Sequence, residues 1–361
     1  MRVLYFGTYE RRYPRNAQVI SCLRKAGVEV RERHEPVWEG MEHKWTAGIG
    51  SALRLGRAQA RLLVRPGAKG ADAVLVGYPG HLDLPAARRA AQNRPLVFNP
   101  LVSLADTLVA DRARFRRGSL PARVLEAIDR RALRSADLIV ADTEANADYL
   151  ASIAELDRAR LAVCFVGAEE RVFKPGWAPR ELFSCLFVGK LIPLHGLKTV
   201  LEAARIASDV PFRIVGDGQL APLLRERSGN VEWIPWVEYQ RLPVELGRTG
   251  CSLGIFGTSA KATRVIPNKV FQALACGTPV ITGDTPAARE LLVDGASALL
   301  VPPGDPGALA DAIRRLSADA ALAKDLGAGG YTTYLAQASE EVLGRRWRGL
   351  VQTLVDGSAR Q

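Results

Sequence analysis

The sequence predicts an α/β protein of two doubly wound domains, each a parallel sheet with helices on both faces. The chain has 361 residues, which is long for one domain and natural for two. Segments typical of buried strands alternate with helical patterns from one end to the other. The alternation pauses once, at FKPGWAP, residues 173–179, where two Pro and one Gly predict a linker.

The first domain is expected over residues 1–172. Its strands are expected at Arg2–Phe6, Val28–Arg33, Ala73–Gly77, Leu96–Asn99, Asp137–Ala141 and Leu161–Val166. Its clearest helical patterns are Asn16–Ala26, Gly50–Val64, Pro121–Arg134 and Glu144–Ile153.

After a linker at 173–183, the second domain is expected over residues 184–336. Its strands are expected at Ser184–Val188, Phe212–Val215, Val231–Ile234, Ser252–Phe256, Pro279–Thr282 and Ala298–Val301. Helices are expected at Gly196–Ala207, Leu220–Arg227, Asn268–Cys276, Ala287–Leu292 and Pro306–Leu316. A last helical segment, within residues 337–361, is expected to pack back on the first domain.

The composition predicts an ordinary globular protein of the cytoplasm. It is 48% hydrophobic and 24% charged, and no apolar run approaches the length of a membrane span. The first residues, MRVLYFGTYERRYPRN, fit a β-strand better than a signal peptide. Five Cys are scattered without metal-like spacing, so we expect free thiols and no metal site.

The net charge of +11 favours anionic partners, unless Arg is simply abundant on solvated faces. Arg54, Arg57, Arg61 and Arg65 recur at three- and four-residue steps and therefore share one helix face. This stripe is compatible with docking at the inner face of an anionic membrane, or with a solvated surface. No nucleic-acid-binding module is evident, so no nucleic-acid partner is expected.

Charged and polar residues gather where the first strand of the second domain ends. Gly189 and Lys190 follow that strand, and His195 and Lys198 lie at the start of the next helix. Three basic side chains at one turn, Lys190, His195 and Lys198, favour an anion site, although isolated lysines there would be ordinary loop charges.

A glycine-rich turn and two tryptophans follow. Gly216 and Gly218 lie between a strand and a helix, where glycine allows close approach of a phosphate or ribose or makes a plain tight turn. Trp233 and Trp236 come after the next strand and could stack on a nucleobase or fill the core.

The stretch IPNKVFQALACGTPVITGD, residues 266–284, predicts a helix, a glycine stop and a buried strand. Pro267 and Asn268 open the helix, which brings Lys269 and Gln272 close to its amino end. Free N–H groups and the helix dipole there favour an anion.

Taken in order, these blocks resemble the family 4 (group 1) nucleotide-sugar glycosyltransferases. The resemblance covers nearly the whole chain and is most specific at 189–196, 216–218 and 268–280. It implies the GT-B fold, in which two Rossmann-like domains face each other across a cleft. It also implies retaining transfer of a sugar from a nucleoside diphosphate to a hydroxyl of a glycan or lipid-linked acceptor. No cofactor beyond the donor is expected, and the absence of an Asp-x-Asp motif agrees with a metal-independent reaction.

The resemblance also implies roles for the cations of the second domain. Lys190 and His195 stand where the family places two basic contacts to the diphosphate. Because the second of these departs from the usual Lys, Lys198 or Lys269 is expected to compensate.

The two acids that usually hold the sugar and the ribose are replaced here by Arg264 and Gln272. Gln272 can still hydrogen-bond a diol, but Arg264 offers only donors and positive charge.

On the acceptor side, Asn99 stands where the family often has a His. Asp106 and His81 are the other catalytic candidates, each with a structural alternative as a surface acid or a packing residue. The loop GTYERRYPRN, residues 7–16, corresponds to a phosphate-contacting loop, in which Thr8 or Arg15 is the expected contact.

Two alternatives share this architecture and stay open. One is a nucleotide-binding protein without transferase activity, and the other is a nucleotide-sugar epimerase.

Overall fold

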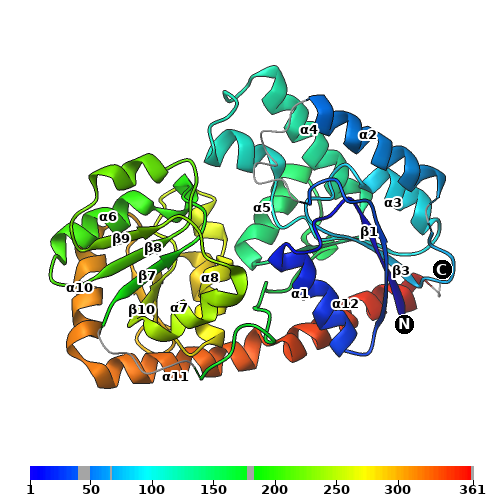
Figure 1. Cartoon of the computed structure of the whole chain (residues 1–361). Helices are drawn as coiled ribbons and strands as arrows, with labels where there is room; N and C mark the ends of the chain where they lie inside the picture. Colours follow the sequence, from blue (N-terminus) through cyan, green and yellow to red (C-terminus); the bar gives the residue numbers. More distant parts are fainter. Residues whose placement is uncertain (40–48, 66, 177–182, 359–361) are drawn as a thin grey trace. The chain divides into compact units, whose positions relative to one another are not determined.

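The computed structural model describes residues 1–39, 49–65, 67–176 and 183–358. The chain divides into two compact units (Figure 1). The first comprises Met1–Val166 with Glu340–Gln361, and the second comprises Gly167–Ser339. Most of the linker predicted at 173–183 lies outside the described residues.

The first unit contains a six-stranded parallel sheet in the order β2-β1-β3-β4-β5-β6. The strands are β1 (Arg2–Gly7), β2 (Glu29–His34), β3 (Ala73–Val76), β4 (Leu96–Phe98), β5 (Leu138–Ala141) and β6 (Leu161–Val163). The central strands are buried on both faces, which explains their continuous apolar runs.

Helices cover both faces of this sheet. One core joins it to α2 (Ile49–Val64), α3 (Leu84–Ala91), α4 (Leu120–Ser135) and α5 (Glu144–Ala154). The other joins it to α1 (Pro14–Lys25) and to α12 (Glu340–Ser358), which lies beside α1 although far from it in sequence (Figure 1). Trp347 of α12 is fully buried in this second core.

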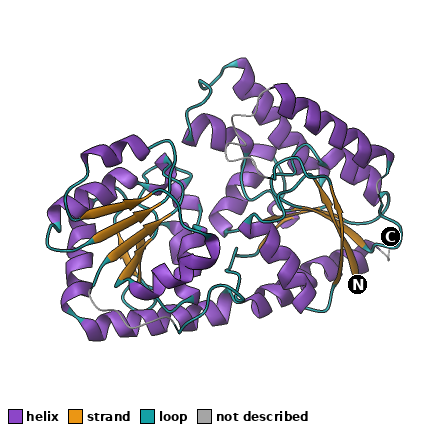
Figure 2. Cartoon of the chain, in the orientation of Figure 1, coloured by secondary structure: helices purple, strands orange, loops and turns teal. Residues whose placement is uncertain are grey.

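The second unit repeats the plan with the strand order β12-β11-β10-β7-β8-β9, again all parallel (Figure 2). Its strands are β7 (Cys185–Val188), β8 (Phe212–Val215), β9 (Val231–Ile234), β10 (Cys251–Leu253), β11 (Val280–Gly283) and β12 (Leu299–Val301). Its helices are α6 (Leu197–Ile206), α7 (Leu242–Arg248), α8 (Asn268–Ala275), α9 (Pro286–Arg289), α10 (Pro306–Ala318) and α11 (Ala320–Gln337).

The predicted fold class is confirmed, and each predicted strand is present, with ends that differ by up to three residues. One helix prediction was wrong: the segment predicted at 220–227 is a six-residue 3₁₀ helix, Ala221–Glu226. Sequence patterning missed α3, whose four alanines leave little helical contrast, and a π-helical turn at Asp106–Asp111.

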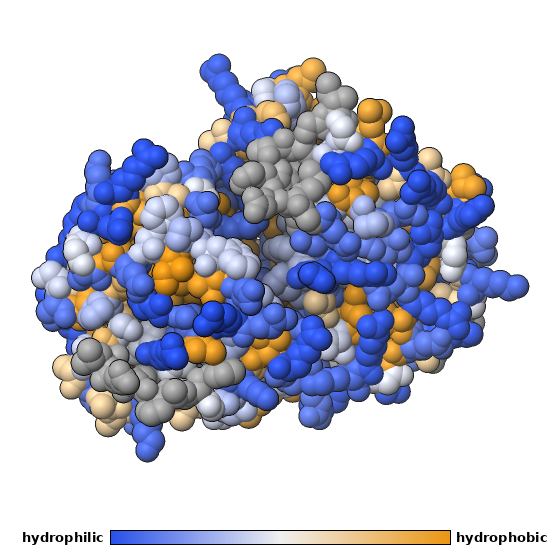
Figure 3. All heavy atoms as spheres, viewed as in Figure 1, coloured by the Kyte–Doolittle hydropathy of each residue, from blue (hydrophilic) through white to orange (hydrophobic). Residues whose placement is uncertain are grey.

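All five cysteines are buried and free. Within the described residues, no helix is both long and apolar enough to cross a membrane. On the face seen in Figure 3, apolar side chains form separate small areas among hydrophilic ones.

Candidate functional site

The loops that follow β7 and β8 meet at the carboxyl edge of the second sheet. Gly189 and Gly216, each next after its strand, have φ of 141° and 139°. A Cβ on Gly216 would lie 2.0 Å from the carbonyl oxygen of Gly189, and one on Gly218 would lie 2.8 Å from that of Leu191. Glycine is therefore required here both by conformation and by close packing of two backbones. Ligands of open α/β sheets bind at this edge.

The predicted His195 lies directly against this loop. Its Cε1 would be 3.2 Å from a Cβ placed on Gly189, and its ring makes an edge contact with Phe187 at 6.2 Å between centroids. A short 3₁₀ turn, Pro193–His195, holds the imidazole there before α6 begins. The sequence-predicted pairing of Gly189 with His195 is thus present in space.

Lys269 reaches the same place from α8. Its Cε would lie 3.8 Å from a Cβ on Gly189, and its Nζ lies 3.5 Å from the centre of the Phe187 ring. The side chain is buried, and its Nζ makes no hydrogen bond to any described residue. Burial lowers the pKa of Lys269 well below its usual value. Once protonated, a buried amine of this kind can donate hydrogen bonds to an anionic oxygen.

The amino end of α8 adds backbone donors to this position. Pro267 occupies the N-cap and offers no side-chain cap to the first turn. Asn268 and Lys269 are the first two residues of the helix, where N–H groups lack helical acceptors and the dipole favours negative charge. The charge of a protonated Lys269 and the dipole at this helix end therefore both favour a bound anion.

The other two predicted lysines differ in setting. Lys190 is exposed in the loop after β7, next to Gly189. Lys198 projects from α6 with 81% of its side chain exposed and lies 3.9 Å from Glu202 one turn later. The structure therefore assigns Lys198 to a solvated helix face, the alternative that the sequence left open.

The two tryptophans separate into different roles. Trp233 is half-buried and donates its indole N–H to the carbonyl of Gly216 at 2.9 Å, which supports the glycine turn. Trp236 is 72% exposed just beyond the carboxyl end of β9. Its ring is thus not part of the core and remains open to stacking.

The residues that replace the family's two acids are both close to α8. Arg264 is half-buried at the end of a 3₁₀ turn, Ala262–Arg264. Gln272 is buried one helical turn after Lys269 and contacts Tyr239. Burial and the charge of Glu169 raise the pKa of Tyr239, whereas the contact with Gln272 lowers it.

In the first unit, Asn99 follows β4 and is fully buried. Its N–H donates to the carbonyl of Val76, and its Oδ1 accepts a hydrogen bond of 3.0 Å from Nε of Arg15. Because Arg15 can only donate, the Asn99 amide must turn its oxygen towards Arg15 and its Nδ2 away from it. Asn99 is therefore set to donate a hydrogen bond and is unsuited to accept a proton.

His81 is also buried, and its contacts favour the packing role. Its Nδ1 lies 2.9 Å from the carbonyl oxygen of Pro79, and its ring packs edge-on against Phe98. Its Nε2 lies 3.4 Å from Oδ1 of Asp129, a carboxylate that already accepts bonds from the N–H groups of 104 and 105.

Asp106 begins the π-helical turn and is half-buried, with Asp111 at the other end of the turn. The N–H of Asp106 donates to the hydroxyl of Ser103 at 3.0 Å. Such turns are frequent at functional sites, but no described contact joins Asp106 to Asn99 or His81.

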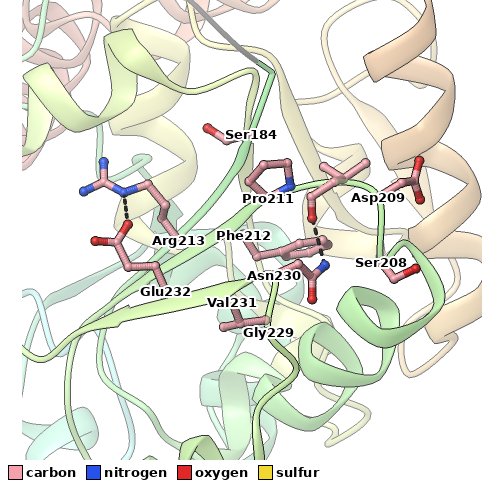
Figure 4. Close-up of a pocket in the computed structure, with 11 residues that line it drawn as sticks. Ser184, Ser208, Asp209, Pro211, Phe212, Arg213, Gly229, Asn230, Val231 and Glu232 are labelled. Atoms are coloured by element: carbon pink, nitrogen blue, oxygen red, sulfur yellow. Dashed lines mark hydrogen bonds and ion pairs between the residues drawn. The ribbon is translucent and has the colours of Figure 1, made fainter.

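A cavity of about 430 Å³ opens at the opposite edge of the second sheet (Figure 4). It is lined by the amino ends of β8 and β9, where Arg213 pairs with Glu232 at 2.8 Å and Asn230 bonds the carbonyl of Val210. These interactions join neighbouring segments of the second unit, and none of the residues belongs to the predicted site.

Among the described residues, no group of three or more His, Cys, Asp or Glu is arranged to bind a metal.

Comparison with known proteins agrees with this arrangement. The family model described as "Glycosyl transferases group 1" matches residues 183–319, which contain every predicted donor-binding residue. Most of the second unit therefore matches the group 1 glycosyl transferases. Among curated proteins, the chain is 30% identical over 236 residues to D-inositol 3-phosphate glycosyltransferase of Mycolicibacterium smegmatis, covering 59% of this chain and 53% of that protein. It is 32% identical over 145 residues to phosphatidyl-myo-inositol mannosyltransferase of Mycobacterium leprae, with 37% of each chain covered.

Solved structures show the same fold over nearly the whole chain. Sucrose-phosphate synthase of Thermosynechococcus elongatus superposes with a TM-score of 0.76 at 17% identity, covering 99% of both chains. Anabaena HepE in complex with UDP-glucose superposes with a TM-score of 0.70 at 16% identity, covering 98% of this chain and 100% of that one. The chain spans about half the length of the first curated relative that it matches.

Three contacts of these sites escaped sequence prediction. Phe187 appeared only as a strand residue, although its ring carries the Lys269 amine. Tyr239, which contacts Gln272, lay in a stretch without a motif. The bond between Arg15 and Asn99 joins residues 84 positions apart, which no local pattern could reveal.

Proposed function

We propose that this protein transfers a sugar from a nucleoside diphosphate to a hydroxyl acceptor. The observation that carries the proposal is Lys269, a buried amine without a hydrogen-bond partner among the described residues, at the carboxyl edge of the second sheet. It lies beside Gly189 and His195 and at the open end of α8. A diphosphate is the ligand that this set of donors fits best.

In this proposal the cations act on the leaving group. Negative charge grows on the diphosphate as the glycosidic bond breaks, and fixed donors that face it lower the barrier. Lys269 supplies the buried charge, while Lys190 and His195 supply exposed and half-buried contacts. The reaction is proposed to retain anomeric configuration and to use these protein groups in place of a metal.

The sugar and ribose contacts must differ from those of relatives that have two acids. Gln272, held against Tyr239, is proposed to bond the ribose through its amide. Arg264 is proposed to add charge next to the diphosphate. Trp236, exposed beyond β9, is the proposed stacking surface for the base.

The proposed acceptor is a glycan or a lipid-linked hydroxyl, in line with the inositol-containing names of the curated relatives. The reaction would take place in the cytoplasm. In the first unit, Asn99 can contribute a hydrogen-bond donor to such an acceptor.

Docking of the first unit on an anionic membrane is a further part of this proposal. The four arginines of the stripe are all exposed: Arg54, Arg57 and Arg61 on α2, and Arg65 directly after it. The same helix exposes Leu53 (61%) and Val64 (76%), so apolar and basic groups occur together on it.

Co-sedimentation with phosphatidylglycerol and phosphatidylcholine vesicles tests the docking. Arg54→Gln/Arg57→Gln should lower binding to the anionic vesicles several-fold. The control Arg225→Gln/Arg315→Gln, in the second unit, changes net charge equally and should not. Equal losses in both pairs would reduce the effect to net charge.

The experiment that tests the transferase proposal has two steps. A thermal-shift panel of UDP, GDP, ADP and their sugars identifies the donor, because a ligand specific to the native state raises the melting temperature. The selected donor is then incubated with acceptor mixtures, and products are analysed with donor alone as the reference. Transfer supports the proposal, whereas conversion of donor alone would select an epimerase. Binding without either reaction would select a nucleotide-binding protein.

A further inference from the structure

Arg15 is an arginine buried without a counter-charge in the first unit. It is fully buried near the start of α1, yet no described carboxylate pairs with it. Its Nη1 donates to the carbonyls of Cys164 and Phe165 at 2.9 and 2.7 Å, and its Nε donates to Asn99. These acceptors satisfy hydrogen bonds, and the Trp347 ring lies 5.6 Å from the guanidinium, but none of these groups carries a negative charge.

Two donors of this pair have no partner. Nη2 of Arg15 and Nδ2 of Asn99 are both buried, and neither makes a hydrogen bond to any described residue. The two side chains are themselves joined by the 3.0 Å bond from Nε to Oδ1. Buried donors are almost always paired, so two orphans on bonded neighbours indicate a missing acceptor.

The residues around Arg15 and Asn99 add positive charge. Burial raises the pKa of Cys164 to about 11, while Arg15 and Arg346 both lower it, which places a second guanidinium close by. Tyr5 adjoins the pair: its hydroxyl donates to Oδ1 of Asn16 at 2.9 Å, and its oxygen faces the side chain of Asn99, which acts to lower the pKa of Tyr5 against the effect of burial. It therefore supplies no negative charge.

The position in the fold is that of a ligand site. Asn99 follows β4, and the carbonyls bonded by Arg15 follow β6, so the pair lies at the carboxyl edge of the first sheet. Open α/β sheets bind their ligands at this edge.

We propose that Arg15 and Asn99 form a binding site for an anionic oxygen, carried by a phosphate or carboxylate group of a substrate. Nη2 and Nδ2 would donate to this oxygen, and the guanidinium would supply the counter-charge. The assignment to a substrate rests on the proposed function, but the anion site itself does not. The alternative occupant of two buried donors is a water molecule.

Inorganic phosphate is the first probe, titrated at constant ionic strength while the melting temperature is followed. The wild type should show a saturable rise. Asn99→Ala should need at least about tenfold more phosphate for the same rise, since it removes one donor and loosens the other. Acetate in a parallel titration separates phosphate from carboxylate preference.

Asn99→Asp separates an anion site from a water site. The new carboxylate would provide the missing counter-charge, so this variant should melt at a higher temperature than wild type without phosphate. It should also lose the phosphate-induced rise. A Lys190→Ala/Lys269→Met variant, which lacks the proposed donor contacts, should keep the Asn99-dependent rise.

Saturating nucleoside diphosphate identifies the source of the group. A phosphate response that persists beside it belongs to the acceptor, and one that disappears belongs to the donor. Equal phosphate responses in wild type, Asn99→Ala and Asn99→Asp would overturn the site, and so would the absence of any response. A lower melting temperature in Asn99→Asp would also contradict it, because it would mean that Arg15 does not lack a counter-charge in the folded protein. Failure of the nucleotide panel alone would leave this site standing and remove only the proposed function.

Discussion

Nζ of Lys269 lies 3.5 Å from the centre of the Phe187 ring. The ring face attracts the amine, but it does not replace the hydrogen bonds of water. Apolar side chains would fill the same space at lower cost, so the buried amine of Lys269 lowers the free energy of unfolding of the unliganded protein.

Lys269→Met is predicted to stabilise the protein. Methionine keeps the length and the contact with Phe187 while removing a buried polar group, so the free energy of unfolding should rise by about 1–3 kcal/mol. Urea denaturation at neutral pH measures this change in the free energy of unfolding. Lys324→Met, at an exposed position of α11, is the matched control and should change little. A destabilised Lys269→Met would mean that the amine has a stabilising partner in the folded state.

The lowered pKa of Lys269 predicts that donor binding takes up a proton. Burial favours the neutral amine in the free protein, and a diphosphate favours the charged form. At a pH above the lowered pKa, binding should therefore weaken as pH rises. Calorimetry in buffers of different ionisation enthalpy should detect the proton, and Lys269→Met should abolish the uptake. Equal enthalpies in all buffers for wild type would contradict the prediction.

Asp83 predicts a stability change in the acid range. It is fully buried and accepts bonds from the N–H and hydroxyl of Thr8 and from Gln59, yet burial raises its pKa from 3.8 to about 6. The folded state then binds the proton more tightly than the unfolded state, so this contribution is present below pH 3.8 and lost as pH rises through 6.

The difference in unfolding free energy between wild type and Asp83→Asn should accordingly fall by about 2 kcal/mol from pH 4 to pH 7. Denaturation of both proteins at each pH measures this difference, and comparing them cancels the other carboxylates. A difference that stays constant, or that grows with pH, would show that the carboxylate is ionised at low cost.

Gly216→Ala is predicted to damage the donor turn. A Cβ there would lie 2.0 Å from the carbonyl of Gly189 at a φ of 139°, so one of two backbones must move. We expect a loss of about 2–4 kcal/mol in unfolding free energy and a large loss of nucleotide affinity. Gly229→Ala is the control, because a Cβ there meets nothing within 4 Å. Unchanged affinity in Gly216→Ala would remove this turn from the site.

Local patterns predicted the architecture because most strands of both sheets are short apolar runs between turn residues, although β2 (EVRERH) is polar. β7 and β8 are examples, each followed by a glycine with positive φ. The helix α3 was missed because the buried residues of LPAARRAA are mostly alanines, which are only weakly hydrophobic. Its burial is decided by α2, α4 and the sheet, not by its own periodicity.

The candidate site was predicted in part, for a physical reason. Residues at strand ends, such as Gly189 and Gly216, are brought together by any parallel sheet, so their proximity follows from the fold. The burial of Lys269 does not follow from the sequence, because it depends on which side of α8 faces β7. The bond between Arg15 and Asn99 depends likewise on the depth at which α1 packs.

The most direct test of the donor site compares a nucleoside diphosphate with its nucleoside on wild type and Lys269→Met, by calorimetry. UDP and uridine are the first pair, followed by the guanine and adenine pairs. The account predicts that one diphosphate binds far more tightly than its nucleoside, and that Lys269→Met weakens the diphosphate at least about tenfold while leaving the nucleoside unchanged. Equal affinities of the two proteins for every diphosphate would contradict it.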